Sequence, residues 1–396
     1  MIKPIPYGRQ NITDQDINAV VEVLKSDFLT QGPKIIELEN KFANYVGSKY
    51  SVAVSNGTAA LHLCSMAMNV KPGDKVITTP ITFSASANCI RYCGGEIVFG
   101  DIDPETYLLD INSVRELLKS SPLGAYKGII PVDFAGRAVN LEQFRALADE
   151  YGLWIIEDAC HSPGGYFTKK NGGKSKCGSS EFADLAIFSF HPVKHIASGE
   201  GGMITTNNKL IYERLLKLRS HGIVKNNNLY TNSIEFANGN NISKEFPNWY
   251  MEMQELGYNY RLSDIQAALA ISQLERADEG LKRRCEIATI YEDAFSDCSF
   301  LKGQSGSIIG HAYHLYVIEV KNRLGLYNYL RDNKVFTQIH YIPVHLMPYY
   351  RHLGWKEGDK PRSEEYYKNC ISLPMFPSLT NEQLMYVIKL VKSFYL

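Results

Sequence analysis

The sequence predicts an α/β fold in which a large domain, built on a mixed but mainly parallel sheet, precedes a smaller C-terminal α+β domain. Six short apolar runs alternate with helical stretches, and their apolar residues are continuous, as in parallel strands covered on both faces. The 396 residues also exceed the usual size of one domain, roughly 100–200 residues. A further strand and helix follow near the C-terminus. We therefore expect a large domain over residues 1–262 and a small one over 263–396.

The first predicted elements are two helices. Thr13-Asp14-Gln15-Asp16 has the form of a capping box, and apolar residues then recur at helical spacing up to Leu24. Residues 26–33 interrupt the pattern. A second amphipathic stretch ends at Gly47, a residue type that favours a helix C-terminus. The apolar positions of the two helices are Ile17, Val20, Val21 and Leu24, then Ile36, Leu38, Phe42, Tyr45 and Val46.

The predicted strands follow in order and are separated mostly by helical stretches. They cover residues 51–54, 76–79, 97–99, 128–132, 154–156 and 185–188. Each is short and apolar throughout, which is typical of strands buried in a parallel sheet. These runs predict the core of the large domain.

An asparagine-rich insertion over residues 224–247 has few apolar residues to anchor it, and we expect a mobile surface loop there. Loops of this length are often functional, so its closing over a substrate is an open alternative. A long helix then begins after Ser263-Asp264, followed by a strand at 315–318 and a final helix from about Asn381. These elements predict the small domain.

The composition excludes several classes of function. Forty-two basic residues balance forty-two acidic ones, so no field for nucleic acid or an anionic membrane surface is expected. The N-terminus has no signal-peptide stretch, and no segment approaches the roughly 20 apolar residues of a membrane span. Eight scattered cysteines without CxxC pairs indicate reduced thiols. We expect no metal. We expect a cytoplasmic protein.

Lys194 and Asp158 are the residue types that a pyridoxal-phosphate enzyme needs most. A lysine forms a Schiff base with this cofactor, and a carboxylate keeps its pyridine nitrogen protonated. Asp158 ends a strand, where it would point into the crevice at the carboxyl edge of the sheet. Lys194 lies in a run of mostly apolar or small residues, and such surroundings lower the pKa of an amine. Taken singly, each could instead be a turn cap or a surface lysine.

A phosphate site is predicted where a strand is followed by Ser55-Asn56-Gly57-Thr58-Ala59 and a helical run. Backbone N–H groups at a helix N-terminus bind phosphate, Gly57 permits close approach, and Thr58 adds a hydroxyl. An ordinary helix cap is the alternative. Ser189 is a second candidate for the phosphate, and His161 for the phenolic oxygen of the cofactor. The joint spacing of these residues with Lys194 favours the cofactor site.

The chain resembles the DegT/DnrJ/EryC1/StrS sugar aminotransferases over nearly its whole length. The segments that carry the resemblance are 56–62, 157–161, 189–194, 257–261 and 340–345. It implies the fold type I of pyridoxal-phosphate transferases, like that of aspartate aminotransferase. It also implies that Lys194 forms the Schiff base and that Asp158 pairs with the pyridine nitrogen. Phe83 would stack on the ring, and Gly57, Thr58, Ala59 and Ser189 would hold the phosphate, with His161 near the ring oxygen.

The same resemblance implies a homodimer, because Asn259 would reach the phosphate of the neighbouring subunit's cofactor. Within the family, residues 5–10 and 24–33 are most similar to enzymes that move the amine of L-glutamate onto C4 of a UDP-linked 4-keto-6-deoxy-N-acetyl sugar, in pseudaminic acid synthesis. Two alternatives stay open: amination at C3 or of a dTDP-linked sugar, and a non-catalytic regulatory protein that binds the cofactor. Candidate substrate-binding residues are Tyr7, Arg261, His314, Tyr341 and His345.

Overall fold

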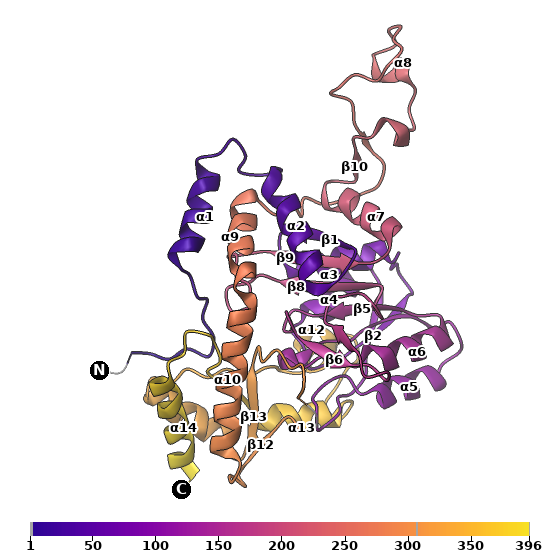
Figure 1. The fold of residues 1–396 in the computed structure, drawn as a ribbon. Coiled ribbons are helices and arrows are strands. Elements are labelled where there is room, and N and C mark those ends of the chain that lie inside the picture. The colour runs from indigo at the N-terminus through magenta and orange to yellow at the C-terminus, as the bar shows by residue number, and fades with distance from the viewer. Residues whose placement is uncertain (1–2, 306–307, 396) are drawn as a thin grey trace.

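A seven-stranded sheet forms the centre of the protein (Figure 1). The structure is a computed structural model that describes residues 3–305 and 308–395. The strands lie in the order β1 (Tyr50–Val54), β9 (Gly202–Thr206), β8 (Leu185–Ser189), β5 (Trp154–Asp158), β4 (Tyr126–Ile130), β2 (Lys75–Thr78) and β3 (Glu96–Phe99). The six predicted strands are confirmed, each to within two residues at either end.

Only β9 runs against the other strands of this sheet as described. It pairs antiparallel with both β1 and β8, whereas β8, β5, β4, β2 and β3 pair parallel in that order. The mixed, mainly parallel sheet is therefore confirmed. The sequence prediction missed β9, because its Gly-Met-Ile-Thr-Thr sequence is short and partly polar.

Helices cover both faces of the sheet, because neighbouring residues of a strand point to opposite sides. Ile129 packs with α5 (Ile111–Lys119) and α6 (Leu141–Tyr151) on one side. Ile130 packs on the other side with α3 (Gly57–Ala67), α4 (Ala85–Tyr92) and α7 (Lys209–Arg219). The continuous apolar runs in the sequence follow from this two-sided burial.

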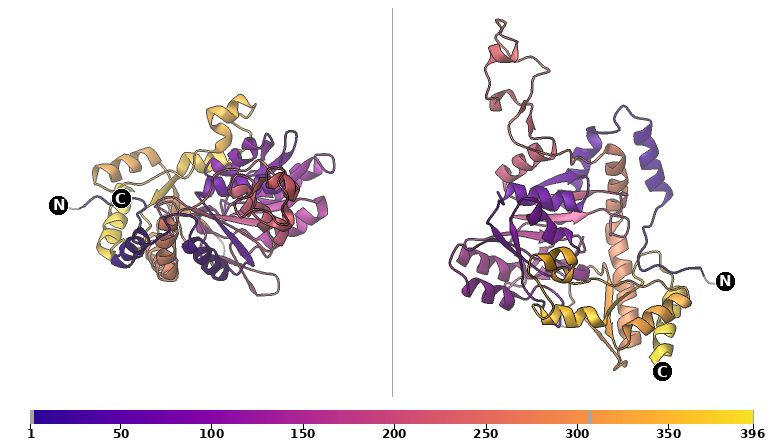
Figure 2. Two further views of the ribbon diagram at one scale, coloured as in Figure 1. Left: turned by 90° about the horizontal axis from the view of Figure 1, so that it is seen from above. Right: turned by 180° about the vertical axis from the view of Figure 1, so that it is seen from behind.

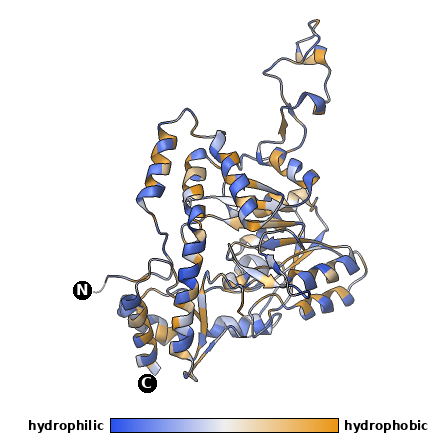
Figure 3. Cartoon of the chain, in the orientation of Figure 1, coloured by the Kyte–Doolittle hydropathy of each residue, from blue (hydrophilic) through white to orange (hydrophobic). Residues whose placement is uncertain are grey.

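The N-terminal helices α1 (Asp14–Leu24) and α2 (Pro33–Val46) pack against α9 (Asp264–Glu275). The predicted capping box of Thr13 and Asp16 is present, and α2 ends at Gly47 in the left-handed conformation. The predicted apolar face of α1 does not pack inward, however: Ile17 and Leu24 are more than half exposed. Figure 3 shows hydrophobic residues along this outlying helix.

The C-terminal part is built on a three-stranded antiparallel sheet of β12 (Leu301–Gly303), β13 (Tyr316–Val320) and β14 (Cys370–Leu373). Helices α10 (Ala277–Phe295), α11 (Arg323–Asp332) and α14 (Asn381–Tyr395) share one apolar core with it. The predicted strand and final helix are thus confirmed. Since α9 packs on α1 and α2, the proposed boundary at residue 262 stays a prediction. The remaining short elements are η1 (Phe134–Gly136), β6 (Tyr166–Thr168), β7 (Lys174–Lys176), η3 (Val344–Leu346), α12 (Pro348–His352) and α13 (Pro361–Asn369).

The asparagine-rich insertion forms an arm that projects away from the rest of the chain (Figures 1 and 2). It contains β10 (Ile223–Val224), η2 (Asn227–Leu229), α8 (Ile234–Ala237) and β11 (Glu252–Met253). Its structure is local: Glu252 accepts hydrogen bonds from the backbone N–H groups of Thr231 (2.8 Å) and Asn232 (2.9 Å). The rings of Tyr230, Phe246 and Tyr250 pack together beside it.

Within the described residues, no helix is both long enough and apolar enough to cross a membrane.

Candidate active site

A cavity of about 650 Å³ lies where the parallel strands of the large sheet end. Residues that follow β1, β2, β4, β5 and β8 line one side of it, which is the crevice where open α/β sheets bind ligands. Residues of the N-terminal segment and the C-terminal part close the other side. Its polar and aromatic lining includes Tyr7, Asn56, Thr58, Thr82, Phe83, Ser86, Tyr92, Asp158, Cys160, His161, Ser189, His191, Lys194, Glu200, Tyr260, His314, His340 and Tyr341.

Asp158 is the last residue of β5 and is 5% exposed. Its carboxylate accepts hydrogen bonds from Ser86 Oγ at 2.7 Å and from the backbone N–H of Cys160 at 3.2 Å. These two donors fix the carboxylate in the cavity wall without neutralising its charge. A buried carboxylate held in this way is suited to pair with a cationic ring nitrogen.

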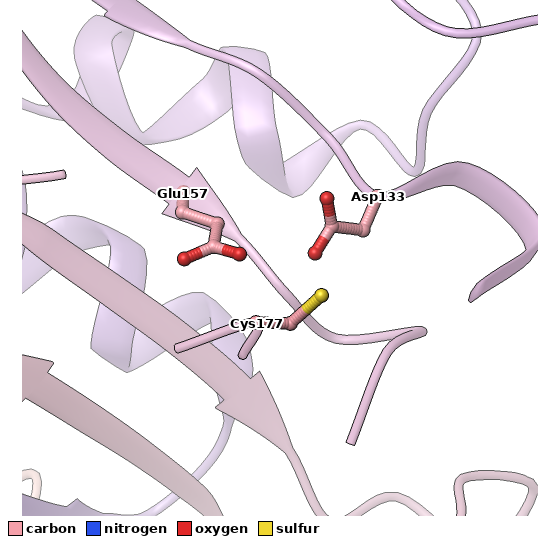
Figure 4. Close-up of side chains that lie close together, drawn as sticks. All are labelled: Asp133, Glu157 and Cys177. Atoms are coloured by element: carbon pink, nitrogen blue, oxygen red, sulfur yellow. The ribbon is translucent and has the colours of Figure 1, made fainter. Parts of the chain in front are cut away.

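Glu157 precedes Asp158 and points to the other side of the sheet, where it meets Asp133 and Cys177 (Figure 4). The ligand atoms of these three buried residues lie within 4.8 Å of one another. Glu157 accepts from the N–H of Gly178 (3.0 Å), and Asp133 accepts from Ser162 Oγ (2.5 Å). Burial raises the pKa of both carboxyls, that of Glu157 strongly. The arrangement is that of two acids sharing a proton.

Lys194 follows β8 in a turn closed by a hydrogen bond from its own N–H to the carbonyl of His191 (2.8 Å). Burial lowers the pKa of its amine, while Cys160 and Asp158 raise it. The lysine lines the large cavity and also a smaller one of about 150 Å³ behind it. It therefore reaches the same space as Asp158 from the neighbouring strand.

The N-terminus of α3 borders the same cavity. Asn56 caps this helix by accepting from the N–H of Ala59 at 2.8 Å, which leaves the N–H groups of Gly57 and Thr58 for a ligand. A Cβ on Gly57 would lie only 3.0 Å from Cβ of Ser189, so glycine allows the helix end to approach that residue. Two backbone N–H groups and two hydroxyls thus converge in a site suited to phosphate.

Two histidines pack together in the cavity wall, His161 from the turn after β5 and His314 from the C-terminal part. The rings of His161 and His314 lie 4.3 Å apart, and Nε2 of His161 lies 3.3 Å from the hydroxyl of Tyr341. Burial lowers the pKa of both histidines well below the ordinary value, so both are neutral. Nδ1 of each is buried without a partner among the described residues. Such an orphaned polar atom indicates a ligand with its own donor or acceptor.

The residues fit pyridoxal phosphate. A carboxylate, a lysine, a phosphate cradle and unpartnered imidazole nitrogens line one cavity, with the 62% exposed ring of Phe83 at its edge. When bound, this cofactor supplies an electron sink for a carbanion. The predicted residues Gly57, Thr58, Ala59, Phe83, Asp158, His161, Ser189 and Lys194 all border this cavity.

Of the candidate substrate residues, Tyr7, His314 and Tyr341 line the cavity, whereas Arg261 and His345 do not. His345 is fully buried in η3, and its Nε2 lies 2.9 Å from Oε1 of Glu364. This corrects the expectation for His345, since the turn directs its ring into the core. Asn259 is exposed and lies outside the cavity of its own chain.

Sequence reasoning did not find several lining residues, among them Ser86, Tyr260 and His340. Ser86 is two residues inside α4, where nothing in the sequence marks it as a partner of Asp158. His340 and Tyr7 reach the site from distant parts of the chain, and the N–H of Met375 donates to the carbonyl of Tyr7 at 2.9 Å. Only the fold brings them together.

The DegT/DnrJ/EryC1/StrS aminotransferase family model matches residues 10–392. The chain belongs to this family. The spore coat polysaccharide biosynthesis protein SpsC of Bacillus subtilis is 38% identical, over 98% of this chain and 96% of that protein. The UDP-4-amino-4,6-dideoxy-N-acetyl-beta-L-altrosamine transaminase of Campylobacter jejuni serotype O:23/36 is 34% identical, over 97% and 95%.

Among solved structures, Helicobacter pylori PseC, an aminotransferase involved in the biosynthesis of pseudoaminic acid, matches with a TM-score of 0.85. It is 27% identical, over 99% of this chain and 100% of that chain. The chain is therefore a sugar aminotransferase of this family, with the pyridoxal-phosphate transferase fold and a requirement for pyridoxal phosphate. The resemblance expected from the sequence is confirmed.

Proposed function

We propose that the enzyme transfers the amino group of L-glutamate to C4 of a UDP-linked 4-keto-6-deoxy-N-acetylhexosamine. The product is a UDP-4-amino-4,6-dideoxy sugar for surface glycans of the pseudaminic acid type. The observation that carries the transfer chemistry is the convergence of Asp158, Lys194 and the N-terminus of α3 on one cavity. The substrate is supported by whole-length similarity to the Campylobacter transaminase.

Lys194 moves the proton in both halves of the reaction. As a free base it takes a proton from the α-carbon of glutamate, and later it returns a proton to C4 of the sugar. The lowered pKa of Lys194 favours the free base that the first step requires. Because one lysine acts from one side of the cavity, the new C–H bond at C4 has a single stereochemistry.

Asp158 and the helix end orient the cofactor for this lysine. The Asp158 carboxylate, held by Ser86 and Cys160, would pair with the ring nitrogen and favour its protonated form. Gly57, Thr58 and Ser189 would hold the phosphate. Two such anchors would orient the cofactor toward Lys194.

A homodimer in the cytoplasm completes the proposal. Large apolar side chains of α1 and the residues after it are exposed: Ile17, Leu24, Phe28 and Leu29 are all 48–55% exposed. An apolar surface of this extent on a soluble chain favours burial against a second copy. Asn259 is exposed, as a residue that serves the neighbouring subunit's cofactor must be.

Product analysis tests the substrate. The purified enzyme is incubated in D₂O with cofactor, glutamate and either the UDP-linked 4-keto sugar, a 3-keto sugar or a dTDP-linked analogue. We expect NMR to show an amine and deuterium at C4 of the UDP sugar only. Amination at C3, or a preference for the dTDP sugar, would replace this substrate while leaving the transfer chemistry intact.

Complementation tests the shared site. The K194A and N259A homodimers are each expected to be nearly inactive, because each lacks one component of every active site. Mixed and re-associated subunits contain sites with both wild-type residues, so part of the activity should return. No recovery in mixtures shown by mass to contain heterodimers would contradict the role of Asn259.

A further inference from the structure

Lys194 separates two cavities, and the smaller one gives it a second electrostatic environment. This cavity of about 150 Å³ is bordered by the N-terminal segment and by the helices α9 and α10. Besides Lys194, its charged or titratable residues are Arg9, His195, Arg276, Glu279 and Arg284. Arg276 is already paired with Asp16.

Arg284 of α10 is the most deeply buried of these groups, at 1% exposed. Its Nη1 donates to the backbone carbonyls of Met375 (3.0 Å), Tyr313 (3.2 Å) and His314 (3.2 Å). No carboxylate bonds to this guanidinium among the described residues. Buried charges are ordinarily paired, because leaving them unpaired is costly. In the part of the chain that the structure describes, the hydrogen-bond acceptors of this buried guanidinium are thus backbone carbonyls.

Two of these hydrogen bonds attach Arg284 directly to the segment that carries His314. That segment packs tightly on η1: a Cβ on Gly136 would lie 2.7–2.8 Å from the backbone nitrogens of Tyr313 and His314. The N–H of Leu315 also donates to the carbonyl of Ala135. Arg284 also binds this segment through the carbonyls of Tyr313 and His314, and the ring of His314 lines the active cavity beside His161.

The positive charge of Arg284 acts on Lys194 as well. Burial lowers the pKa of Arg284 only to about 10, so the guanidinium stays charged at neutral pH. Two neighbours oppose its effect on the lysine, since Asp158 and Cys160 favour a protonated amine. The histidines that face Lys194 are neutral because burial lowers the pKa of each: His161, His195, His314 and His340. The remaining charged groups on its two cavities are Arg9, Arg276, Glu200 and Glu279.

We infer that Arg284 is a positioning residue for catalysis: it fixes His314 in the active cavity and places a buried positive charge on the small cavity that Lys194 also lines. The inference rests on the proposed role of Lys194. It also explains why a positive charge is buried here. A nearby cation disfavours the protonated form of a lysine, and the proposed mechanism requires Lys194 as a free base.

The test is a pH titration of the visible absorbance of the cofactor linked to Lys194, which follows protonation of the linked nitrogen. R284Q removes the charge but can still donate to carbonyls, whereas R284K keeps the charge and loses part of the carbonyl anchorage. R283Q is the matched control, because Arg283 is the adjacent residue of α10 but binds Leu379 and Asn381 instead. Circular dichroism checks the fold of each variant.

We expect the midpoint of this absorbance titration to rise by roughly one pH unit in R284Q. In R284K and R283Q it should stay at the wild-type value. R284K should slow the reaction with glutamate roughly tenfold, because His314 is less firmly held. An unchanged midpoint in folded R284Q would overturn the inference. If R284Q does not fold, a raised titration midpoint in R284K would overturn the inference instead, because R284K keeps the positive charge.

The proposed function fails separately from this inference. A wild-type enzyme that forms no visible band with the cofactor would exclude Lys194 as the linking residue. A normal absorbance band whose titration midpoint is the same in R284Q and in wild type would leave the proposed function intact and remove only the role of Arg284.

Discussion

Glu157 and Asp158 are consecutive in β5, but their carboxyl groups lie on opposite sides of the sheet and have different partners. Asp158 accepts from Ser86 in the active cavity, and Glu157 faces Asp133 in the core. The alternation of a β-strand places one acid in the active cavity and encloses the other in the core. The strand end thus presents one carboxylate to the cavity, although two acids occur in the sequence.

Replacing Asp158 with asparagine should lower turnover by at least about 100-fold. The neutral amide keeps the shape of the side chain but cannot favour a protonated ring nitrogen. We expect the cofactor to remain bound, because the phosphate cradle is unchanged. S86A is the matched comparison: it removes one donor to Asp158 but keeps the charge, and should lose much less activity. Steady-state kinetics measure the turnover of the two variants, and cofactor absorbance measures cofactor binding. Equal turnover in D158N and wild type would mean that a group other than Asp158 pairs with the ring nitrogen.

Replacing Glu157 with glutamine should stabilise the enzyme increasingly as pH rises. The folded-state pKa of Glu157 lies above its unfolded value of 4.5, so its contribution to stability is full below pH 4.5 and is lost as pH rises toward the folded pKa. Each pH unit in that window costs up to about 1.4 kcal/mol of unfolding free energy. Glutamine does not titrate, and its amide can donate to Asp133 while its carbonyl accepts from Gly178.

Thermal unfolding at pH 5 and pH 8 measures this difference. The gap in melting temperature between E157Q and wild type should widen by several degrees at the higher pH. E181Q is the control, because Glu181 is on the surface and pairs with Lys169. A gap that is constant with pH would mean that Glu157 does not hold a proton in the folded protein.

The parts of the fold that the sequence predicted are those that depend on local pattern. Continuous apolar runs identified six parallel strands, and Thr13 and Gly47 marked helix ends through their own backbone preferences. β9 was missed because Thr205 and Thr206 look polar in isolation. In the structure both are buried, and their hydroxyls donate to the carbonyls of Gly178 and Asp184.

The parts of the site that could not be predicted depend on contacts between distant residues. Ser86 meets Asp158 across 72 positions, and the cavity residues Tyr7 and His340 come from opposite ends of the chain. His345 was misplaced for the same reason, since its partner Glu364 becomes visible only when η3 and α13 pack. The sequence could single out Lys194 and Asp158, which line the same cavity, because the chemistry expected of them admits few other residue types.

Replacing Lys194 with alanine should reduce turnover by on the order of 10⁴-fold or more, because no other free amine lines the described cavity. The phosphate cradle and Asp158 remain, so the variant should still bind cofactor and retain it together with the aminosugar as a stable coloured complex. Absorbance spectra and product assays measure the two properties. Undiminished turnover in this variant is incompatible with the proposed mechanism.

Replacing Gly57 with alanine should weaken cofactor binding roughly tenfold, which corresponds to about 1.4 kcal/mol. The added Cβ would lie 3.0 Å from Cβ of Ser189 and would push the N-terminus of α3 away from the other phosphate ligands. G303A is the control, because a Cβ there would meet only the carbonyl of Val317 at 3.9 Å. Fluorescence titration of cofactor-free protein gives the affinity, and equal dissociation constants for G57A and wild type would place the phosphate elsewhere.

Replacing Glu252 with alanine should unfold the projecting arm and leave the body of the enzyme intact. The carboxylate accepts from Thr231 and Asn232 and organises the turn between η2 and α8. The arm contributes no residue to the described lining of the active cavity of its own chain. Limited proteolysis should therefore cut E252A within residues 225–250 much faster than wild type, while the main thermal transition is unchanged.

E245A is the control, because the side chain of Glu245 makes no hydrogen bond within the described residues. If E252A also loses turnover with its fold preserved, the arm acts at an active site that its own chain does not form, and the neighbouring subunit is where it must reach.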